Sequence, residues 1–209
     1  MRVAVIPARG GSRRIPRKNI KLFHGKPIIA YSIETAKASG LFDEVFVTTD
    51  DFEIASIAER YGAHALGRPE ELSVNGAGTQ EVVKWVLTAA LTNPPTPIDY
   101  VCCIYATAPM MLAGDLRRGF DLVSNSSMNY AFSIGTRPCL HDAGQWYWGH
   151  ASAFANSWPL FDALTYMVPI PAERVCDINL PEDWIRAEEM YARLHGIETR
   201  SQAMERLGL

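Results

Sequence analysis

Residues 3–19 read VAVIPARGGSRRIPRKN, a short apolar run followed at once by a glycine-containing basic stretch. The apolar run, 3–6, is typical of a buried β-strand. Six cations and no acid lie between Arg9 and Lys21, although the whole chain has a formal net charge of -3. Glycine lets backbone N–H groups approach phosphate oxygens, and cations offset phosphate charge. The stretch therefore predicts a polyphosphate-binding loop after the first strand, with a solvated basic loop as the alternative.

Two common phosphate-binding fingerprints are absent from the sequence. It contains no G-x-x-x-x-G-K-[ST] motif and no G-x-G-x-x-G motif. Residues 24–27, HGKP, lack both the upstream glycine and the hydroxyl of the first motif. We therefore expect neither a P-loop enzyme nor a simple dinucleotide-binding protein.

Length and composition indicate a single globular domain, 1–209. The hydrophobic content of 48% and charged content of 21% are ordinary for such a domain. The cations are concentrated in one stretch, which argues against nucleic acid as the main partner. No apolar run approaches the roughly 18 residues of a membrane span, and the first run is too short for a signal peptide. Four cysteines without C-x-x-C spacing disfavour disulfides and thiolate metal sites, so we expect a reducing cytoplasm.

Apolar runs alternate with helical patterns along the chain, which predicts an α/β fold with a Rossmann-like, mostly parallel sheet. The expected strands are 3–6, 45–49, 63–66, 99–104, 130–134, 145–148 and 166–170. The expected helices are 27–39, a helix capped by Asp50 or Asp51 that runs to 61, 79–91, 112–123 and 181–194. In the strand 145–148, residues 145 and 147 should share one face, and the two tryptophans the other.

The loop 105–109, YATAP, follows the buried strand 99–104. Ligands of open α/β sheets bind outside the carboxyl ends of the strands. We therefore expect Tyr105 and Thr107 to lie beside the basic loop, in the substrate site.

Four segments together resemble the CMP-sugar synthetases, or acylneuraminate cytidylyltransferases, which activate nine-carbon keto-acid sugars. They are 5–19, 21–34 (KLFHGKPIIAYSIE), 102–109 (CCIYATAP) and 141–149 (HDAGQWYWG). The stretch 142–145 favours the branch of the family that uses pseudaminic acid. The resemblance covers most of residues 1–195 and implies a fold of the nucleotide-diphospho-sugar transferase type.

The resemblance implies transfer of CMP from CTP to the sugar acid. The anomeric hydroxyl attacks the α-phosphate and pyrophosphate leaves, a reaction that needs mainly positioning and charge neutralisation. The branches that use legionaminic or sialic acid are the nearest alternatives. A 3-deoxy-manno-octulosonate cytidylyltransferase is less expected, because the loop after 101–104 does not match that branch. From another class, a CTP-binding protein without catalysis is the alternative.

Most of the implied site residues contact the nucleotide. On the resemblance, these residues are Arg9, Gly10, Gly11, Ser12, Arg13, Lys18, Asn19, Arg68 and Thr79. Those implied to act in catalysis are Arg9, Ser12 and Lys18, with Lys18 neutralising charge at the α-phosphate or leaving group. Read without the resemblance, Arg68 could be a surface loop arginine and Thr79 a helix cap.

The sugar and metal sites are implied further along the chain. Gln145 and Tyr147 resemble sugar-pocket residues, whereas Asp142 could orient sugar hydroxyls or form a turn. Asp177 and Asn179 resemble the family's Mg²⁺ ligands; in a strand, both side chains would face the same way and could converge on one ion. The family usually has aspartate at both positions, so the uncharged Asn179 predicts weaker Mg²⁺ affinity. Alternatively, the pair only shapes the turn before the last helix.

A segment typical of the family is short in this chain. Relatives usually carry a few dozen residues between the strand ending near 133 and the stretch 142–145, and here only a short connection joins 134 to 141. That excursion forms much of the dimer contact and contributes sugar-contacting residues. We therefore expect the nucleotide half of the site to persist, whereas a homodimer and the sugar half are in doubt.

Overall fold

The computed structural model describes residues 1–74, 77–91, 96–137 and 139–207. Its centre is a seven-stranded sheet in the order β5-β4-β1-β6-β8-β7-β9. The strands are β1 (Arg2–Pro7), β4 (Glu44–Thr49), β5 (His64–Gly67), β6 (Tyr100–Ile104), β7 (Tyr130–Gly135), β8 (His141–His150) and β9 (Thr165–Pro169). Within this sheet β8 runs antiparallel to its neighbours β6 and β7, and the other pairs are parallel. The predicted mostly parallel α/β fold is confirmed.

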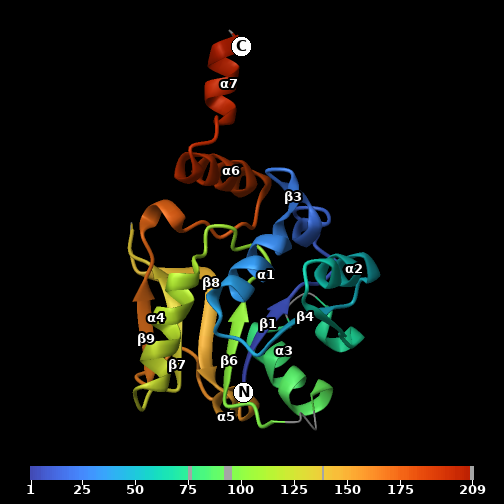
Figure 1. Ribbon diagram of the computed structural model, residues 1–209, viewed down its shortest axis with the longest axis vertical. Helices are drawn as coiled ribbons and strands as arrows, with labels where there is room; N and C mark the ends of the chain where they lie inside the picture. The colour runs from blue at the N-terminus through green and yellow to red at the C-terminus, as the bar shows by residue number, and fades with distance from the viewer. Residues whose placement is uncertain (75–76, 92–95, 138, 208–209) are drawn as a thin grey trace.

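Helices cover both faces of the sheet and one of its ends (Figure 1). They are α1 (Ile28–Ser39), α2 (Phe52–Arg60), α3 (Thr79–Trp85), α4 (Ala113–Ser124), α5 (Ala151–Ala155), α6 (Pro181–His195) and α7 (Arg200–Leu207). A π-helical turn, Val86–Ala90, extends α3. Among the helices described, none is both long and apolar enough to cross a membrane.

Apolar side chains point alternately to the two faces of the sheet along each strand, and they form one layer of the core on each face. In β1, Ala4 and Ile6 pack with residues of α1, α2 and α4, whereas Val3 and Val5 pack on the opposite face with α3 and α5. In β8, Trp146 and Trp148 join the first layer and Tyr147 the second. The alternation predicted for β8 is therefore confirmed, because successive side chains of a strand point to opposite faces.

A third apolar cluster closes the carboxyl end of the sheet. Trp184 and Ala187 of α6 pack on Phe23, which belongs to the hairpin of β2 (Leu22–Phe23) and β3 (Lys26–Pro27). Figure 1 shows α6 beyond the ends toward which β1 and β6 point, with α7 extending away from the body. Neither the hairpin nor α7 was expected from the sequence pattern.

Two local details of the structure bear on the site. Residues 175–180 are irregular, so Asp177 and Asn179 are not aligned by a strand. The polar groups of this segment bond side chains: Lys18 Nζ donates to the Ile178 carbonyl and the Asn179 N–H to Asp183. The strand predicted at 145–148 begins at 141, so Asp142 lies in β8. There its Oδ1 accepts from the Gly144 N–H at 2.8 Å, the hydrogen bond of a local turn. Antiparallel pairing with β7 continues to Gly135–His141, which extends the strand.

Candidate active site

A cavity of about 560 Å³ opens at the carboxyl ends of β1 and β6. That volume lies within the usual range for small-molecule sites. The predicted residues that line it are Arg9, Ser12, Arg13, Lys18, Asn19, Arg68, Thr79, Tyr105, Thr107 and Asn179. These residues come from widely separated parts of the chain, and the sheet brings them together because the strands that precede them end at the same edge.

The lining of this cavity is strongly cationic. Arg9, Arg13, Arg14, Lys18 and Arg68 all line it, and its described lining contains no Asp or Glu. Five positive groups around one cavity create a field that attracts a multiply charged anion. The arrangement is therefore suited to a polyphosphate.

Arg68 carries donors that lack acceptors. Its side chain is only 9% exposed, and Nε and Nη2 are buried without a hydrogen-bond partner in the described structure. Burial lowers the pKa of Arg68, partly opposed by the charge of Asp50. Buried N–H groups are costly unless an acceptor is present. An anionic ligand in the cavity would supply that acceptor.

Lys18 and Asn19 are held by the backbone around them. Lys18 Nζ donates to the Ile178 carbonyl at 2.6 Å, and burial lowers the pKa of Lys18 against the opposing charge of Asp177. Asn19 is buried, and its Nδ2 donates to the Arg9 carbonyl at 2.9 Å. Lys18 thus presents its charge at the cavity wall, while Asn19 closes the basic loop on itself.

The two glycines of the loop do not line the cavity. The Gly10 N–H donates to Asp50 Oδ1 at 2.8 Å, and a Cβ on Gly10 would lie 2.6 Å from Asp51 Oδ2. Close packing against Asp51 therefore explains why residue 10 is glycine. Gly11 has open space around it, and contact of either glycine with phosphate stays a prediction.

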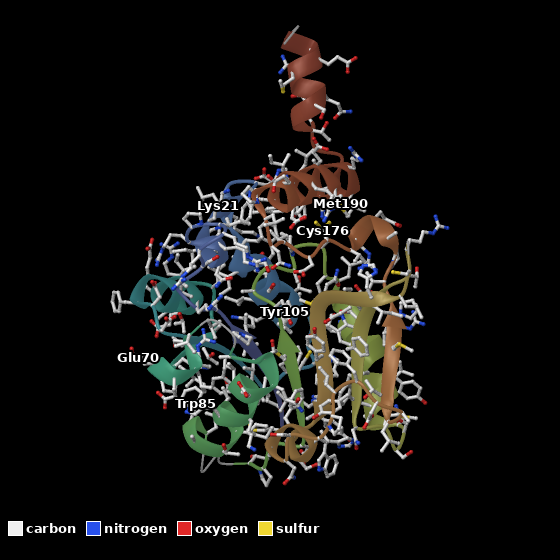
Figure 2. The ribbon with its side chains drawn as sticks, turned by 180° about the vertical axis from the view of Figure 1, so that it is seen from behind. Lys21, Glu70, Trp85, Tyr105, Cys176 and Met190 are labelled. Atoms are coloured by element: carbon white, nitrogen blue, oxygen red, sulfur yellow. The ribbon has the colours of Figure 1, made fainter. Side chains whose placement is uncertain are left out.

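A row of hydroxyl groups leads from the cavity to Asp142. Thr79 Oγ1 lies 3.4 Å from the Tyr105 hydroxyl, which lies 3.3 Å from the Tyr147 hydroxyl; Tyr147 in turn donates to Asp142. Figure 2 shows Tyr105 near the centre of the molecule. Burial raises the pKa of both tyrosines, so both keep their protons at neutral pH. The sequence named these four residues separately, and the fold joins them.

Gln145 offers a second unpartnered group. It is 3% exposed; Nε2 donates to the Arg174 carbonyl at 2.7 Å, and Oε1 is buried without a partner in the described structure. Arg174 is fixed by Asp115, with Nη2 and Oδ1 3.1 Å apart. Sequence patterns missed Arg174 and Asp115 because no motif links residues so far apart.

Asp177 and Asn179 lie side by side, although their backbone is not a strand. Asn179 Nδ2 donates to Asp177 Oδ2, and Asn179 Oδ1 accepts from Arg14 Nη2 at 3.2 Å. Within the described residues, no three His, Cys, Asp or Glu side chains gather as a metal site. Mg²⁺, however, is often held by one or two carboxylates together with substrate phosphates and water. The Asp177 carboxylate, which accepts from Asn179 at the wall of the cation-lined cavity, fits that pattern.

The chain belongs to the cytidylyltransferase family, whose model matches residues 3–142. The pseudaminic acid cytidylyltransferase of Campylobacter jejuni is 33% identical over 226 residues, covering 92% of this chain and 97% of the relative. The CMP-N,N'-diacetyllegionaminic acid synthase of Legionella pneumophila is 33% identical over 141 residues, 65% of this chain and 60% of the relative. The N-acylneuraminate cytidylyltransferase of Escherichia coli is 42% identical over 102 residues, 46% of this chain and 24% of the relative.

Solved structures share the fold. A CMP-2-keto-3-deoxy-manno-octonic acid synthetase complexed with CTP has a TM-score of 0.71 and 17% identity, covering 92% of this chain and 99% of the other. A nucleotidyl transferase from Methanothermobacter has a TM-score of 0.69 and 16% identity, covering 93% and 99%. The family resemblance, enzyme class and fold type predicted from the sequence motifs are therefore confirmed.

Proposed function

We propose that this enzyme transfers CMP from CTP to pseudaminic acid, giving CMP-pseudaminic acid and pyrophosphate. The observation that carries the proposal is the cation-lined cavity, from whose wall a row of hydroxyl groups runs to Asp142. The 33% identity to the Campylobacter enzyme along nearly the whole chain supports this sugar over its relatives.

In this proposal, the cavity binds the triphosphate. Arg9, Arg13 and Ser12 lie at its wall with Arg68, whose unpaired N–H groups would donate to phosphate oxygens. Lys18 would neutralise the charge that develops on the α-phosphate and on the leaving pyrophosphate. Charge neutralisation of this kind is the main contribution of proteins to phosphoryl-type transfer.

The sugar acid would bind next to the triphosphate, on the side of Tyr105 toward Tyr147 and Gln145. The free Oε1 of Gln145 can accept from a hydroxyl or amide of the sugar. The anomeric hydroxyl must lose its proton as the new O–P bond forms. In this proposal Asp142, which accepts from Tyr147 and from the Gly144 N–H, would take that proton.

The proposal includes Mg²⁺, held by Asp177 with Asn179 beside it. When bound, the ion would screen the charge of the phosphates. For this, Asn179 would have to turn its amide oxygen away from Arg14. Because that oxygen carries no charge, we expect weaker Mg²⁺ binding than with two carboxylates. Asn179→Asp should therefore lower the Mg²⁺ concentration that gives half-maximal rate.

Pyrophosphate release tests the proposal. Purified protein is given CTP, Mg²⁺ and either pseudaminic, legionaminic or sialic acid. Release that needs both substrates and is fastest with pseudaminic acid supports it. Faster release with another acid would assign the enzyme to that branch of the family. CTP binding without release of pyrophosphate for any of the three acids would favour the alternative, a CTP-binding protein without catalysis. The presence of Asn179 where the family usually has a carboxylate also favours that alternative.

The cellular setting is part of the same proposal. Synthesis of an activated sugar acid from CTP would take place in the cytoplasm and supply glycosylation of a bacterial surface structure such as flagellin. Deletion of the gene should then remove the sugar from that structure, and a mass-spectrometric measurement of the flagellin glycan would check it.

A further inference from the structure

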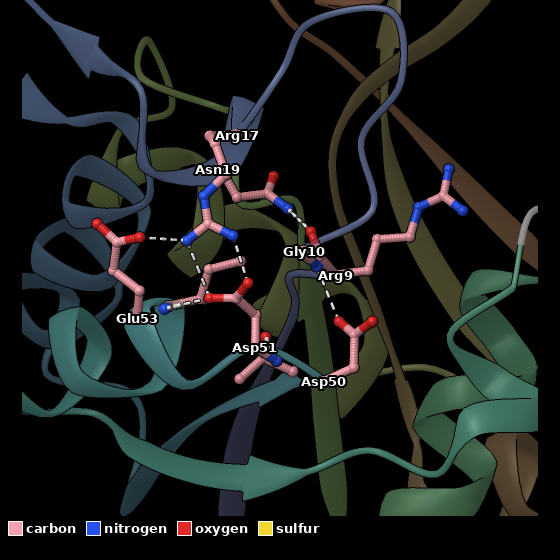
Figure 3. A network of polar contacts seen from close by, with 9 residues as sticks. Arg9, Gly10, Arg17, Asn19, Asp50, Asp51 and Glu53 are labelled. Atoms are coloured by element: carbon pink, nitrogen blue, oxygen red, sulfur yellow. Dashed lines mark hydrogen bonds and ion pairs between the residues drawn. The ribbon is translucent and has the colours of Figure 1, made fainter.

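Three acids after β4 contact the two ends of the basic loop (Figure 3). Asp50 contacts residue 10, near the start of the loop, whereas Asp51 and Glu53 contact Arg17, near its far end. Asp50 follows the last residue of β4, Asp51 is the N-cap of α2, and Glu53 lies in the first turn of α2. We call Asp50, Asp51 and Glu53 the acidic clamp.

At the start of the loop, the contact is one hydrogen bond. The Gly10 N–H donates to Asp50 Oδ1 at 2.8 Å. The next turn follows at once, because the Ser12 N–H donates to the Gly10 carbonyl at 3.0 Å. Asp50 therefore fixes the backbone just before Ser12, which lines the cavity.

At the far end, the contact is an ion-pair network. Arg17 Nη2 donates to Asp51 Oδ1 at 3.0 Å, and the guanidinium also pairs with Glu53. Arg17 adopts a left-handed backbone conformation with φ of 55°, which a non-glycine residue adopts only when its surroundings hold it. The Lys18 and Asn19 side chains follow directly, and both line the cavity.

Arg17 is thus a cation of the basic loop whose side chain ties the loop to Asp51 and Glu53. It does not line the cavity, unlike Arg9, Arg13 and Lys18. A loop of like charges would otherwise spread to relieve repulsion, and ordering it on ligand binding would weaken affinity.

We infer that the acidic clamp positions the loop for the triphosphate, with Asp50 as the positioning residue at its start. This inference rests on the proposed function, because it takes CTP as the ligand of the loop. A second observation connects Asp50 to the ligand site. Asp50 and Arg68 line a smaller cavity next to the first one, and the buried Arg68 donors without acceptors also line the nucleotide cavity.

Two neutral substitutions separate positioning from charge. Asp50→Asn keeps an acceptor for the Gly10 N–H, whereas Asp50→Ala removes it, and both remove the negative charge. The matched control is Asp43→Ala, since Asp43 Oδ2 likewise accepts a backbone N–H, that of Arg2, at 2.6 Å. CTP affinity is measured by calorimetry on each full-length variant with Mg²⁺ present, and amide hydrogen exchange is followed over residues 9–17.

Positioning predicts that Asp50→Ala binds CTP about threefold to tenfold more weakly than Asp50→Asn, the typical effect of one hydrogen bond between neutral groups. Exchange in the loop should be faster in Asp50→Ala only, and Asp43→Ala should bind CTP as the wild type does. Equal CTP affinity and equal hydrogen exchange of the loop in the two Asp50 variants would overturn this inference and leave the proposed function standing. A wild-type protein that does not bind CTP would overturn the proposed function, and the inference with it.

Discussion

Arg68 is a buried cation whose Nε and Nη2 donors have no acceptor in the described structure. Natural proteins rarely keep such a group unless a ligand uses it, because desolvation of an unpaired charge is expensive. We therefore expect Arg68 to contribute to ligand binding at a cost in folding stability. The same reasoning separates Arg68 from Arg174, whose charge is compensated by Asp115.

The Arg68→Met substitution tests this separation. We expect the free energy of unfolding to stay the same or to rise, since methionine fills similar space without a buried charge. CTP affinity should fall at least tenfold, because hydrogen bonds to charged groups contribute about 1.5–3 kcal/mol. Urea unfolding and calorimetric titration with CTP measure the two effects. Unchanged CTP affinity would contradict the role of Arg68.

Gly10 and Gly11 form a matched pair of neighbours. A Cβ on Gly10 would lie 2.6 Å from Asp51 Oδ2 and 2.9 Å from Asp51 Cβ, whereas a Cβ on Gly11 meets nothing within 4 Å. Gly10→Ala should therefore destabilise the fold by about 1–3 kcal/mol, and Gly11→Ala should have little effect. Urea unfolding of both variants checks this, and equal stabilities would show that the loop can yield.

The ion pair of Asp51 with Arg17 makes stability depend on pH. Hydrogen bonding from Arg17 holds the pKa of Asp51 below its ordinary value, which is about 3.9 in an unfolded chain. The folded state then binds fewer protons than the unfolded state. The contribution of the ion pair to the free energy of unfolding is therefore complete above about pH 4, and it is lost as the pH falls through the lower pKa that Asp51 has in the folded state. Asp51→Asn, which can still cap α2, should be less stable than wild type at pH 7. Unfolding at pH 7 and pH 3 should show that difference shrinking, and a constant difference would contradict the pairing.

At the scale of elements, α4 and β8 pack through one small residue. A Cβ on Gly119 of α4 would lie 2.5 Å from the Trp146 ring and 2.8 Å from Trp148 Cδ1. This close approach lets the two tryptophans fill the layer beneath the helix. Because β8 also carries Gln145 and Tyr147, the packing of α4 helps to place the predicted sugar residues.

Gly119→Ala should therefore destabilise the protein, and Gly114→Ala in the same helix is its control. Gly114 is exposed, and a Cβ there meets nothing within 4 Å. We expect Gly119→Ala to lower the free energy of unfolding by about 1–3 kcal/mol. Gly114→Ala should leave it unchanged or raise it by up to about 1 kcal/mol through helix propensity. Equal effects of the two substitutions in urea unfolding would show that α4 can move off β8.

At the scale of the whole molecule, the five cations Arg9, Arg13, Arg14, Lys18 and Arg68 gather around one cavity within a single chain, and we expect them to suffice for CTP binding. CTP affinity should therefore not depend on whether the protein is a monomer or a dimer. Sedimentation equilibrium gives the oligomeric state, and CTP titrations at low and high protein concentration give the affinity in each state. CTP binding confined to concentrations at which dimers form would show that a partner completes the site.

The sequence by itself determined the fold class and the identity of most candidate residues. Apolar runs with alternating helical patterns require strands covered by helices, and the basic stretch after the first strand can only meet ligands at the carboxyl end of the sheet. The segments 5–19, 21–34, 102–109 and 141–149 together were sufficient to predict the family, because each is contiguous in the chain. Local periodicity also placed Trp146 and Trp148 on one face.

Only the tertiary structure decided which of these residues meet. Asp50 reaches Gly10, Arg174 holds Gln145, and Tyr147 joins Tyr105 to Asp142. Residues 175–180 could not be assigned from their pattern, since Lys18, far away in sequence, satisfies their backbone. The physical reason is that periodicity reports how a segment buries its own side chains. Pairing between distant polar groups depends on strand order, which no local pattern encodes.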